Sequence, residues 1–325
     1  MGFQTKTLLL SFAITIVLGF IIVPILKKLK VGQIERDDGP ESHLKKQGTP
    51  TMGGIIIMLG IGIVTIAAYI YYRTVDVELA RNLLPILGLT IGFGAIGFID
   101  DFKKLVLKNT KGLKPSLKML GLLIISVVYI IYLIKGLNLG TDTYIPILKE
   151  YINIPIYAYI PFAILVILAT TNAVNLTDGI DGLSSSVCTI IITCLTIIAT
   201  TLGVKEIVIF GAIVIGAVLG FLMFNIHPAK VFMGDTGSLF LGGVISGIAL
   251  YLKIPLILLL IALIPVIETL SVIIQVTYFK KTGKRVFKMA PIHHHLELSG
   301  WRENQVVMLF SVITLIVCVV GLKIV

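Results

Sequence analysis

The chain has 325 residues, of which 57% are hydrophobic and only 14% are charged. A soluble domain carries roughly 25% charged residues, so this composition and a mean hydropathy of +1.03 exclude a soluble protein. The formal net charge of +10 does not indicate a nucleic-acid partner. The basic residues lie between apolar runs, where the orientation of a membrane protein explains them better.

Apolar runs of about 20 residues, the length that crosses a hydrocarbon core of about 30 Å, recur between short polar loops. We expect an all-α polytopic membrane protein with about ten transmembrane helices in a single domain, residues 1–325. The runs are 7–26, 52–72, 82–99, 117–136, 158–174, 182–202, 206–224, 236–252, 254–278 and 305–323. The ninth contains Pro255 and Pro265, which predict a broken or tilted helix. Cys188, Cys194 and Cys318 lie within runs and are interpreted as buried apolar residues.

The distribution of basic residues orients the chain. If the N-terminus lies outside, the inside loops are 27–51, 100–116, 175–181, 225–235 and 279–304. These loops hold 18 of the 27 Lys and Arg residues, against 8 in the outside segments, and Lys118 lies at the inner end of the fourth run. We therefore expect the inside loops to face the cytoplasm. The outside segment 137–157 alternates partly between apolar and polar residues, which predicts a short hairpin.

A pair of adjacent aspartates, Asp100 and Asp101, ends the third run and is followed by Lys103 and Lys104. Adjacent carboxylates repel each other and need a cation or a raised pKa. The alternative is a charged stop for the helix. Lysines alone would supply such a stop, and carboxylates at a helix C-terminus oppose the helix dipole. We interpret the aspartates as functional.

Asn172, Asn175, Asp178 and Asp181 recur at every third position where the fifth run ends. In a helix this spacing keeps neighbouring pairs near one face, and Gly179 permits a turn and the close approach of a ligand. An ordinary polar turn is the alternative. Four Asn or Asp residues without a nearby lysine instead predict a site for a cation or for sugar hydroxyls.

The eighth run begins with Asp235, Thr236, Gly237 and Ser238, preceded by Phe232, which could stack on a base. Helix N-capping by Asp235 or Thr236 is a serious alternative to a functional role. Both roles can coexist, because a helix N-terminus also attracts phosphate.

Three consecutive histidines, His293, His294 and His295, follow the ninth run. Consecutive side chains cannot all point one way, so we do not expect a three-histidine metal cage. Imidazoles with an ordinary pKa near 6.5 suit hydrogen bonding to phosphate or proton exchange. Glu268 is the one acid deep in a run, where pairing within the bundle and a functional role are both open.

Gly92, Gly94 and Gly97 satisfy the pattern G-x-G-x-x-G, but no strand precedes them. The dinucleotide-binding interpretation is therefore rejected, and close helix packing is expected instead. The spaced glycines Gly88/Gly92, Gly216/Gly220 and Gly243/Gly247 are interpreted in the same way.

Six segments occur in order on the expected inner face: 46–54, Asp100–Asp101, 175–179, Asn225 with Pro228–Ala229, 234–238 and 291–295. In these segments the chain resembles the polyprenyl-phosphate N-acetylhexosamine-1-phosphate transferase superfamily and, within it, the phospho-N-acetylmuramoyl-pentapeptide transferases. The resemblance covers essentially the whole chain.

This resemblance implies a ten-helix homodimer in the bacterial cytoplasmic membrane, with both termini outside and the site facing the cytoplasm. The implied donor is UDP-N-acetylmuramoyl-pentapeptide, the acceptor undecaprenyl phosphate, and the products lipid I and UMP, in peptidoglycan synthesis. Mg²⁺ is the implied cofactor, and Asp235 its implied ligand. The catalytic candidates are Asp100, Asp101, Asp235 and His294. The substrate-binding candidates are Lys46, Thr51, Lys104, Asn175, Asp178, Gly179, Asp181, Asn225, Phe232, Gly234, His293 and His295. The resemblance implies that the nucleoside of the donor is lined by Lys46, Thr51, Asn175, Asp178, Gly179, Asp181, Asn225 and Phe232, and that the histidine triplet lies on the donor's phosphate and sugar side.

Two alternatives remain open at this point. A secondary transporter would place polar groups near the bilayer midplane and usually contains related repeats, whereas here the ionisable groups gather at one face and no repeat is visible. A sister transferase that uses UDP-N-acetylglucosamine would share most of the motifs. The pattern of the histidine loop favours the muramoyl donor.

Overall fold

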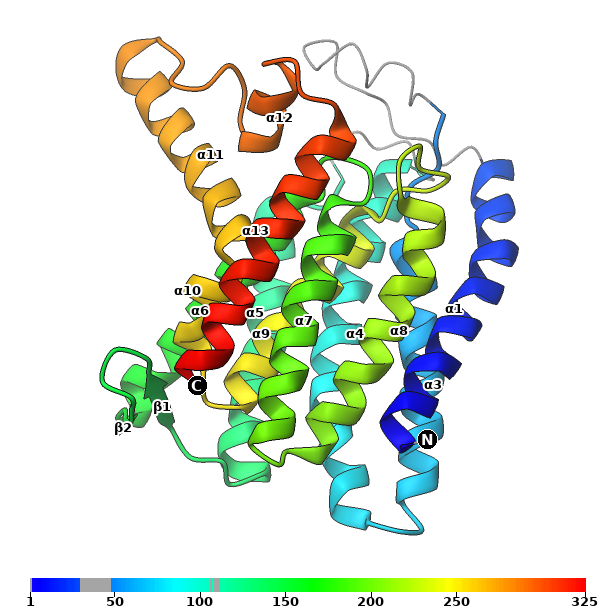
Figure 1. Ribbon diagram of the computed structural model, residues 1–325, viewed down its shortest axis with the longest axis vertical. Helices are drawn as coiled ribbons and strands as arrows, with labels where there is room; N and C mark the ends of the chain where they lie inside the picture. The colour runs from blue at the N-terminus through cyan, green and yellow to red at the C-terminus, as the bar shows by residue number, and fades with distance from the viewer. Residues whose placement is uncertain (1, 30–47, 106, 108–111) are drawn as a thin grey trace.

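The computed structural model describes residues 2–29, 48–105, 107 and 112–325, which form a bundle of helices (Figure 1). In chain order the elements are α1 (Phe3–Lys28), α3 (Gly54–Tyr72), α4 (Val77–Leu105), α5 (Pro115–Ile131), η1 (Tyr132–Gly136), β1 (Asp142–Ile145), β2 (Glu150–Asn153), α6 (Ile156–Thr177), α7 (Leu183–Thr201), α8 (Lys205–Asn225), α9 (Gly234–Tyr251), η2 (Pro255–Ile257), α10 (Leu258–Ile261), α11 (Leu263–Thr282), α12 (Ile292–Glu297) and α13 (Glu303–Ile324).

Nine of the helices in the described residues are long and apolar enough to cross a membrane: α1, α3, α4, α5 with η1, α6, α7, α8, α11 and α13. The expected eighth run corresponds to α9, an 18-residue helix whose first turn is polar. From Thr236 to Tyr251 every residue of α9 is buried, because α4 and α6 pack against it. The chain is therefore an all-α, multi-pass membrane protein, as predicted.

The expected ninth run is broken, as its prolines predicted. It begins with η2 and α10, and α11 starts afresh after Ala262. Pro265 has no N–H to donate to the carbonyl of Ile261, four residues earlier, which favours a break in the helix here. Beyond the break, α11 leans away from the bundle (Figure 1).

Glycines allow the central helices to approach one another closely. A Cβ at Gly216 on α8 would collide with the backbone carbonyl of Leu8 on α1, and one at Gly97 on α4 would collide with the carbonyl of Asp235 on α9. The packing role predicted for these glycines is confirmed. It is wrong for Gly88, where a Cβ would meet no described atom within 4 Å.

The outer surface of the bundle is apolar. Phe20 on α1 is 68% exposed and Met308 on α13 is 70% exposed, which suits contact with lipid chains. All three cysteines are buried and unpaired by disulfides, as expected.

The expected hairpin is present: β1 and β2 pair antiparallel, with Asp142 opposite Asn153. It lies at the same end of the bundle as both chain termini, while α12 lies at the opposite end (Figure 1). We refer to these two ends as the hairpin end and the site end.

Cysteine labelling should distinguish the two membrane faces. Ile147, which is 93% exposed at the hairpin end, and Lys284, just beyond α11, are suitable positions. We expect a membrane-impermeant thiol reagent to label Ile147→Cys in intact cells, and Lys284→Cys only after permeabilisation, because the basic loops should face inward. The buried native cysteines should stay unlabelled. The reverse labelling pattern would contradict the orientation.

Candidate active site

The first turn of α9 lies at the site end and is held there by a carboxylate from α4. Asp101, only 5% exposed, accepts hydrogen bonds from the amide of Thr236 at 2.9 Å, its hydroxyl at 2.6 Å and the amide of Asp235 at 3.3 Å. The first amides of a helix have no partner within it, and a carboxylate there is favourable. The N-cap residue is Met233, without a side-chain cap. The alternative that Asp235 or Thr236 caps its own helix is therefore not found, because Asp101 performs this role from another helix.

Two glycines allow this close contact. At Gly97, one turn before Asp101, there is no room for a Cβ against the backbone of Asp235. Gly234 has a φ of +73°, which L side chains rarely adopt, and a Cβ there would lie 2.8 Å from Asp101 Oδ2 and 2.9 Å from Thr51 Oγ1. A side chain at either position would push Asp101 and the start of α9 apart.

Two lysines bridge the carboxylates of α4 and α9. Lys118 Nζ lies 2.6 Å from Asp235 Oδ2 and 3.3 Å from Asp100 Oδ2. Lys104 Nζ lies 3.1 Å and 2.8 Å from the same two oxygens. The amide of Leu113 also donates to Asp100 Oδ1 at 2.7 Å. Sequence reasoning did not select Lys118. The sequence feature that could have indicated Lys118 is its position in the first turn of an otherwise apolar helix.

The end of α6 supplies an amide and a further carboxylate. Asn175 Nδ2 lies 2.8 Å from both Asp235 Oδ1 and Ser238 Oγ. Asp178 follows as the C-cap of α6. Burial raises the pKa of Asp178 to about 8, and the nearby carboxylates of Asp235 and Asp101 act in the same direction. Each carboxylate added here thus makes the next harder to ionise.

The carboxylates of this cluster are side chains of the type that binds a magnesium ion. Four carboxylates, those of Asp100, Asp101, Asp178 and Asp235, lie here with two lysines, which contact Asp100 and Asp235. Carboxylate oxygens are the ligands that Mg²⁺ prefers. The pKa of Asp178 is raised first by burial and then by the carboxylates of Asp235 and Asp101, and a divalent cation beside these carboxylates would lower it.

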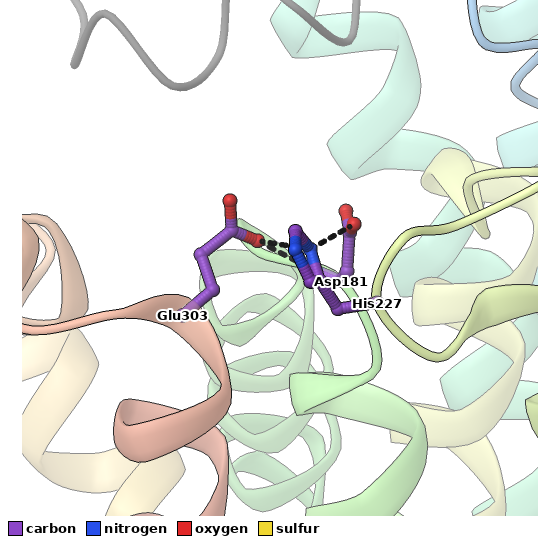
Figure 2. Close-up of side chains that lie close together, drawn as sticks. All are labelled: Asp181, His227 and Glu303. Atoms are coloured by element: carbon purple, nitrogen blue, oxygen red, sulfur yellow. Dashed lines mark hydrogen bonds and ion pairs between the residues drawn. The ribbon is translucent and has the colours of Figure 1, made fainter.

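A second polar cluster joins side chains from three segments (Figure 2). His227 Nδ1 lies 2.9 Å from Asp181 Oδ2 and 3.6 Å from Glu303 Oε2. The amide of Ala229 donates to the same Asp181 oxygen at 3.0 Å, and the amide of Asp181 to Glu303 at 3.4 Å. Each of the three side chains offers an atom that can bind a metal, and these atoms lie within 4.8 Å of one another. The contacts among them connect the α6–α7 turn to the α8–α9 loop and to α13. Sequence reasoning did not select His227 or Glu303.

The loop before α9 is braced from within. Asn225, 3% exposed, accepts a hydrogen bond from Ser185 Oγ at 2.7 Å and donates to the carbonyl of Val231 at 3.1 Å. The amide of Phe232 donates to the carbonyl of Pro50 at 2.8 Å, so the segment before α3 runs along this loop. Asn225 thus shapes the loop that presents the half-buried Phe232.

The three histidines diverge, as predicted. His293 is fully buried, with Nδ1 3.0 Å from Glu268 Oε1. His294 Nδ1 lies 2.8 Å from Glu297 Oε2. His295 Nδ1 accepts a hydrogen bond at 3.1 Å from a backbone amide of the preceding loop. The pairing anticipated for Glu268 is therefore found, and its partner is a histidine of the triplet.

Most of the predicted site residues lie together at the site end. Around the start of α9 lie Thr51, Asp100, Asp101, Lys104, Asn175, Asp178, Gly234 and Asp235. The adjoining loops and helix ends carry Gly179, Asp181, Asn225, Phe232 and His293. His294 and His295 make their hydrogen bonds within α12 and the loop before it. Lys46 lies outside the described residues.

Residues 83–253 match Glycosyl transferase family 4. Together with the multi-pass bundle, this match makes the protein a membrane-embedded transferase. Residues 46–58 also match Phospho-N-acetylmuramoyl-pentapeptide-transferase signature 1. The chain is 50% identical over 316 residues to the phospho-N-acetylmuramoyl-pentapeptide-transferase of Clostridium botulinum (strain Eklund 17B / Type B), covering 97% of this chain and 94% of that protein. It is 49% identical over 315 residues to the same-named protein of Acetivibrio thermocellus, covering 96% and 92%. The chain belongs to the phospho-N-acetylmuramoyl-pentapeptide-transferase family.

The contact between α4 and α9 can be tested with two glycines of the same helix. We expect Gly97→Ala to lower the stability of the detergent-solubilised protein by about 1–3 kcal/mol, because its Cβ would overlap the carbonyl of Asp235. Gly88→Ala is the matched control. Its Cβ meets no described atom, so the higher helix propensity of alanine should preserve or raise stability by up to about 1 kcal/mol. Equal melting temperatures for the two variants would contradict this packing.

Proposed function

We propose that the chain transfers phospho-N-acetylmuramoyl-pentapeptide from its UDP-linked form to undecaprenyl phosphate, giving lipid I and UMP in peptidoglycan synthesis. Membership of the family and similarity over nearly the full length support this function. The structural observation that carries the proposal is the group of four carboxylates and two lysines at the membrane-helix ends.

The reaction brings a diphosphate and a phosphate monoester together. An oxygen of the lipid phosphate bonds to the phosphorus that carries the sugar, and the bond from that phosphorus to the oxygen of UMP breaks. The reacting groups repel each other, so cations must offset their charge. Lys104 and Lys118 are placed to do so, because both already contact Asp100 and Asp235. Mg²⁺ held by Asp235, with Asp178 nearby, would supply further positive charge to the phosphates.

We assign different tasks to the two adjacent aspartates. A phosphate monoester has a second pKa near 6 and is mostly ionised at neutral pH, so proton removal contributes little there. Asp100 instead holds Lys104 and Lys118 where the lipid phosphate must enter. Asp101 fixes the first turn of α9 and hence Asp235. We place His294 and His295 on the side of the donor's phosphate and sugar.

The proposed location is the bacterial cytoplasmic membrane, with the site end facing the cytoplasm. The bias of Lys and Arg towards the loops of that end supports this orientation. A site at helix ends also suits a lipid acceptor, whose phosphate lies at the interface while its chain stays in the bilayer. Homodimerisation is part of the same proposal and is measured by the mass of the detergent-solubilised protein.

Paired turnover of two donors tests the proposed substrate. With purified protein, undecaprenyl phosphate and Mg²⁺, we expect UDP-N-acetylmuramoyl-pentapeptide to be used at least about tenfold better, a difference of about 1.4 kcal/mol in transition-state binding. The basic segment from Lys280 at the end of α11 to Lys288 can attract the carboxylates of the attached peptide. Equal or better use of UDP-N-acetylglucosamine would support the sister transferase, and uptake of solute without transfer would support a transporter.

The metal-binding role proposed for Asp235 is tested by Asp235→Asn. This variant should lose at least about 10³-fold in kcat, because a neutral amide neither holds Mg²⁺ nor pairs with Lys118. Activity is measured across a titration of Mg²⁺, together with the melting temperature. Asp142→Asn is the matched control, since Asp142 pairs with Lys253 at the hairpin end, and should retain activity. Near-normal turnover of Asp235→Asn with an unchanged Mg²⁺ dependence would rule out the role.

A further inference from the structure

Glu268 and His293 form a fully buried ionisable pair that the proposed chemistry does not use. Both side chains are 0% exposed, and Nδ1 of His293 lies 3.0 Å from Oε1 of Glu268. Glu268 belongs to the transmembrane helix α11, whereas His293 belongs to α12 at the site end. An acid within a membrane span is costly, and a functional role is the first hypothesis for it.

The hydrogen bonding of this pair is incomplete. Across the part of the chain that the structure describes, neither Glu268 Oε2 nor His293 Nε2 has a hydrogen-bond partner. Unpaired buried polar atoms destabilise a fold, so stability alone does not account for the pair. A carboxylate on Nδ1 does fix the orientation of an imidazole and places the proton on that nitrogen.

The other edge of the His293 ring lies against the site. A Cβ at Gly179 would collide with His293 Nε2, so the ring touches the backbone of the turn between α6 and α7. The ring has little freedom to move away, because Glu268 holds its Nδ1 edge and the ring of His294 lies 4.1 Å from it, centroid to centroid. Asp178, one residue before Gly179, belongs to the carboxylate cluster.

We infer that Glu268 is a positioning residue that, through His293, fixes the α6–α7 turn at Gly179 and so sets the binding geometry of the nucleotide-linked donor. The inference rests on the proposed function. Asn175, which contacts Asp235 at 2.8 Å, and Asp181 lie on either side of this turn. Movement of the turn would therefore disturb the donor side of the site while leaving the lysines on α4 and α5 in place.

The first test removes the acceptor for the His293 Nδ1 proton. Glu268→Leu replaces the acid with an apolar side chain of similar size, which suits a membrane helix, so the variant should fold. Size-exclusion chromatography and thermal unfolding check this. We expect the KM for the donor to rise about tenfold, the size of one charge-assisted hydrogen bond, with the KM for undecaprenyl phosphate unchanged. Glu268→Gln, whose amide oxygen can still accept from Nδ1, should restore the donor KM to within about threefold of wild type.

Glu206→Leu is the matched control. Glu206 is also a hydrogen-bonded acid of a membrane helix, accepting from Tyr251 at 2.6 Å, but it lies on α8 at the hairpin end. Its loss should leave the KM of both substrates unchanged. A donor KM in Glu268→Leu equal to that of wild type, or an equal rise for both substrates, would overturn the positioning role.

The second test uses the contact between His293 and Gly179. Gly179→Ala should raise the donor KM in the wild-type background, because its Cβ would overlap the ring. In a His293→Ala background the same substitution should raise the donor KM by less than about twofold, because the obstructing ring is absent. An equal rise in donor KM on Gly179→Ala in both backgrounds would overturn the inference. If the wild-type protein transfers neither sugar phosphate, the proposed function itself is refuted. If the wild-type protein transfers the sugar phosphate and the variants have an unchanged donor KM, only the positioning role is refuted.

Discussion

The contact of Asp101 with the first turn of α9 is the interaction on which the rest of the site depends. Every residue of α9 from Thr236 to Tyr251 is buried, so water cannot satisfy the amides at its start and the protein must do so itself. Asp101 accepts from two of those amides and from the Thr236 hydroxyl. The position of Asp235, on the same turn, follows from this contact.

Charge balance is the second constraint. Carboxylates at a membrane-helix end lose hydration and repel one another, so they remain ionised only with cations beside them. Lys104 and Lys118 serve Asp100 and Asp235 together, whereas Asp178 is left with a raised pKa of about 8. In the proposed function, a divalent cation would offset the repulsion between these carboxylates. The lysines and that cation would then meet the substrate phosphates.

The break before α11 gives the histidine segment its place. Because α11 leans out from the bundle (Figure 1), the chain returns through α12, which contacts both α11 and α13. Successive residues of a helix point about 100° apart. One histidine of the triplet therefore faces inward to Glu268 and Gly179, while its neighbours bond to Glu297 and to the preceding loop.

The sequence by itself determined the membrane class, the approximate spans, the break near Pro265, the hairpin and the gathering of polar motifs at one end. These features depend on local hydrophobic length, on the chemistry of proline and on the alternation of short strands. Only the tertiary structure decided that Asp101 caps α9, that Lys118 reaches Asp235 and that Asn225 faces inward. It also decided that His227 links Asp181 to Glu303. Asp101 and Thr236 are 135 residues apart in the chain. Such partners are chosen by how the helices pack and by where glycines such as Gly97 and Gly234 let backbones approach, and no local pattern in the sequence encodes that geometry.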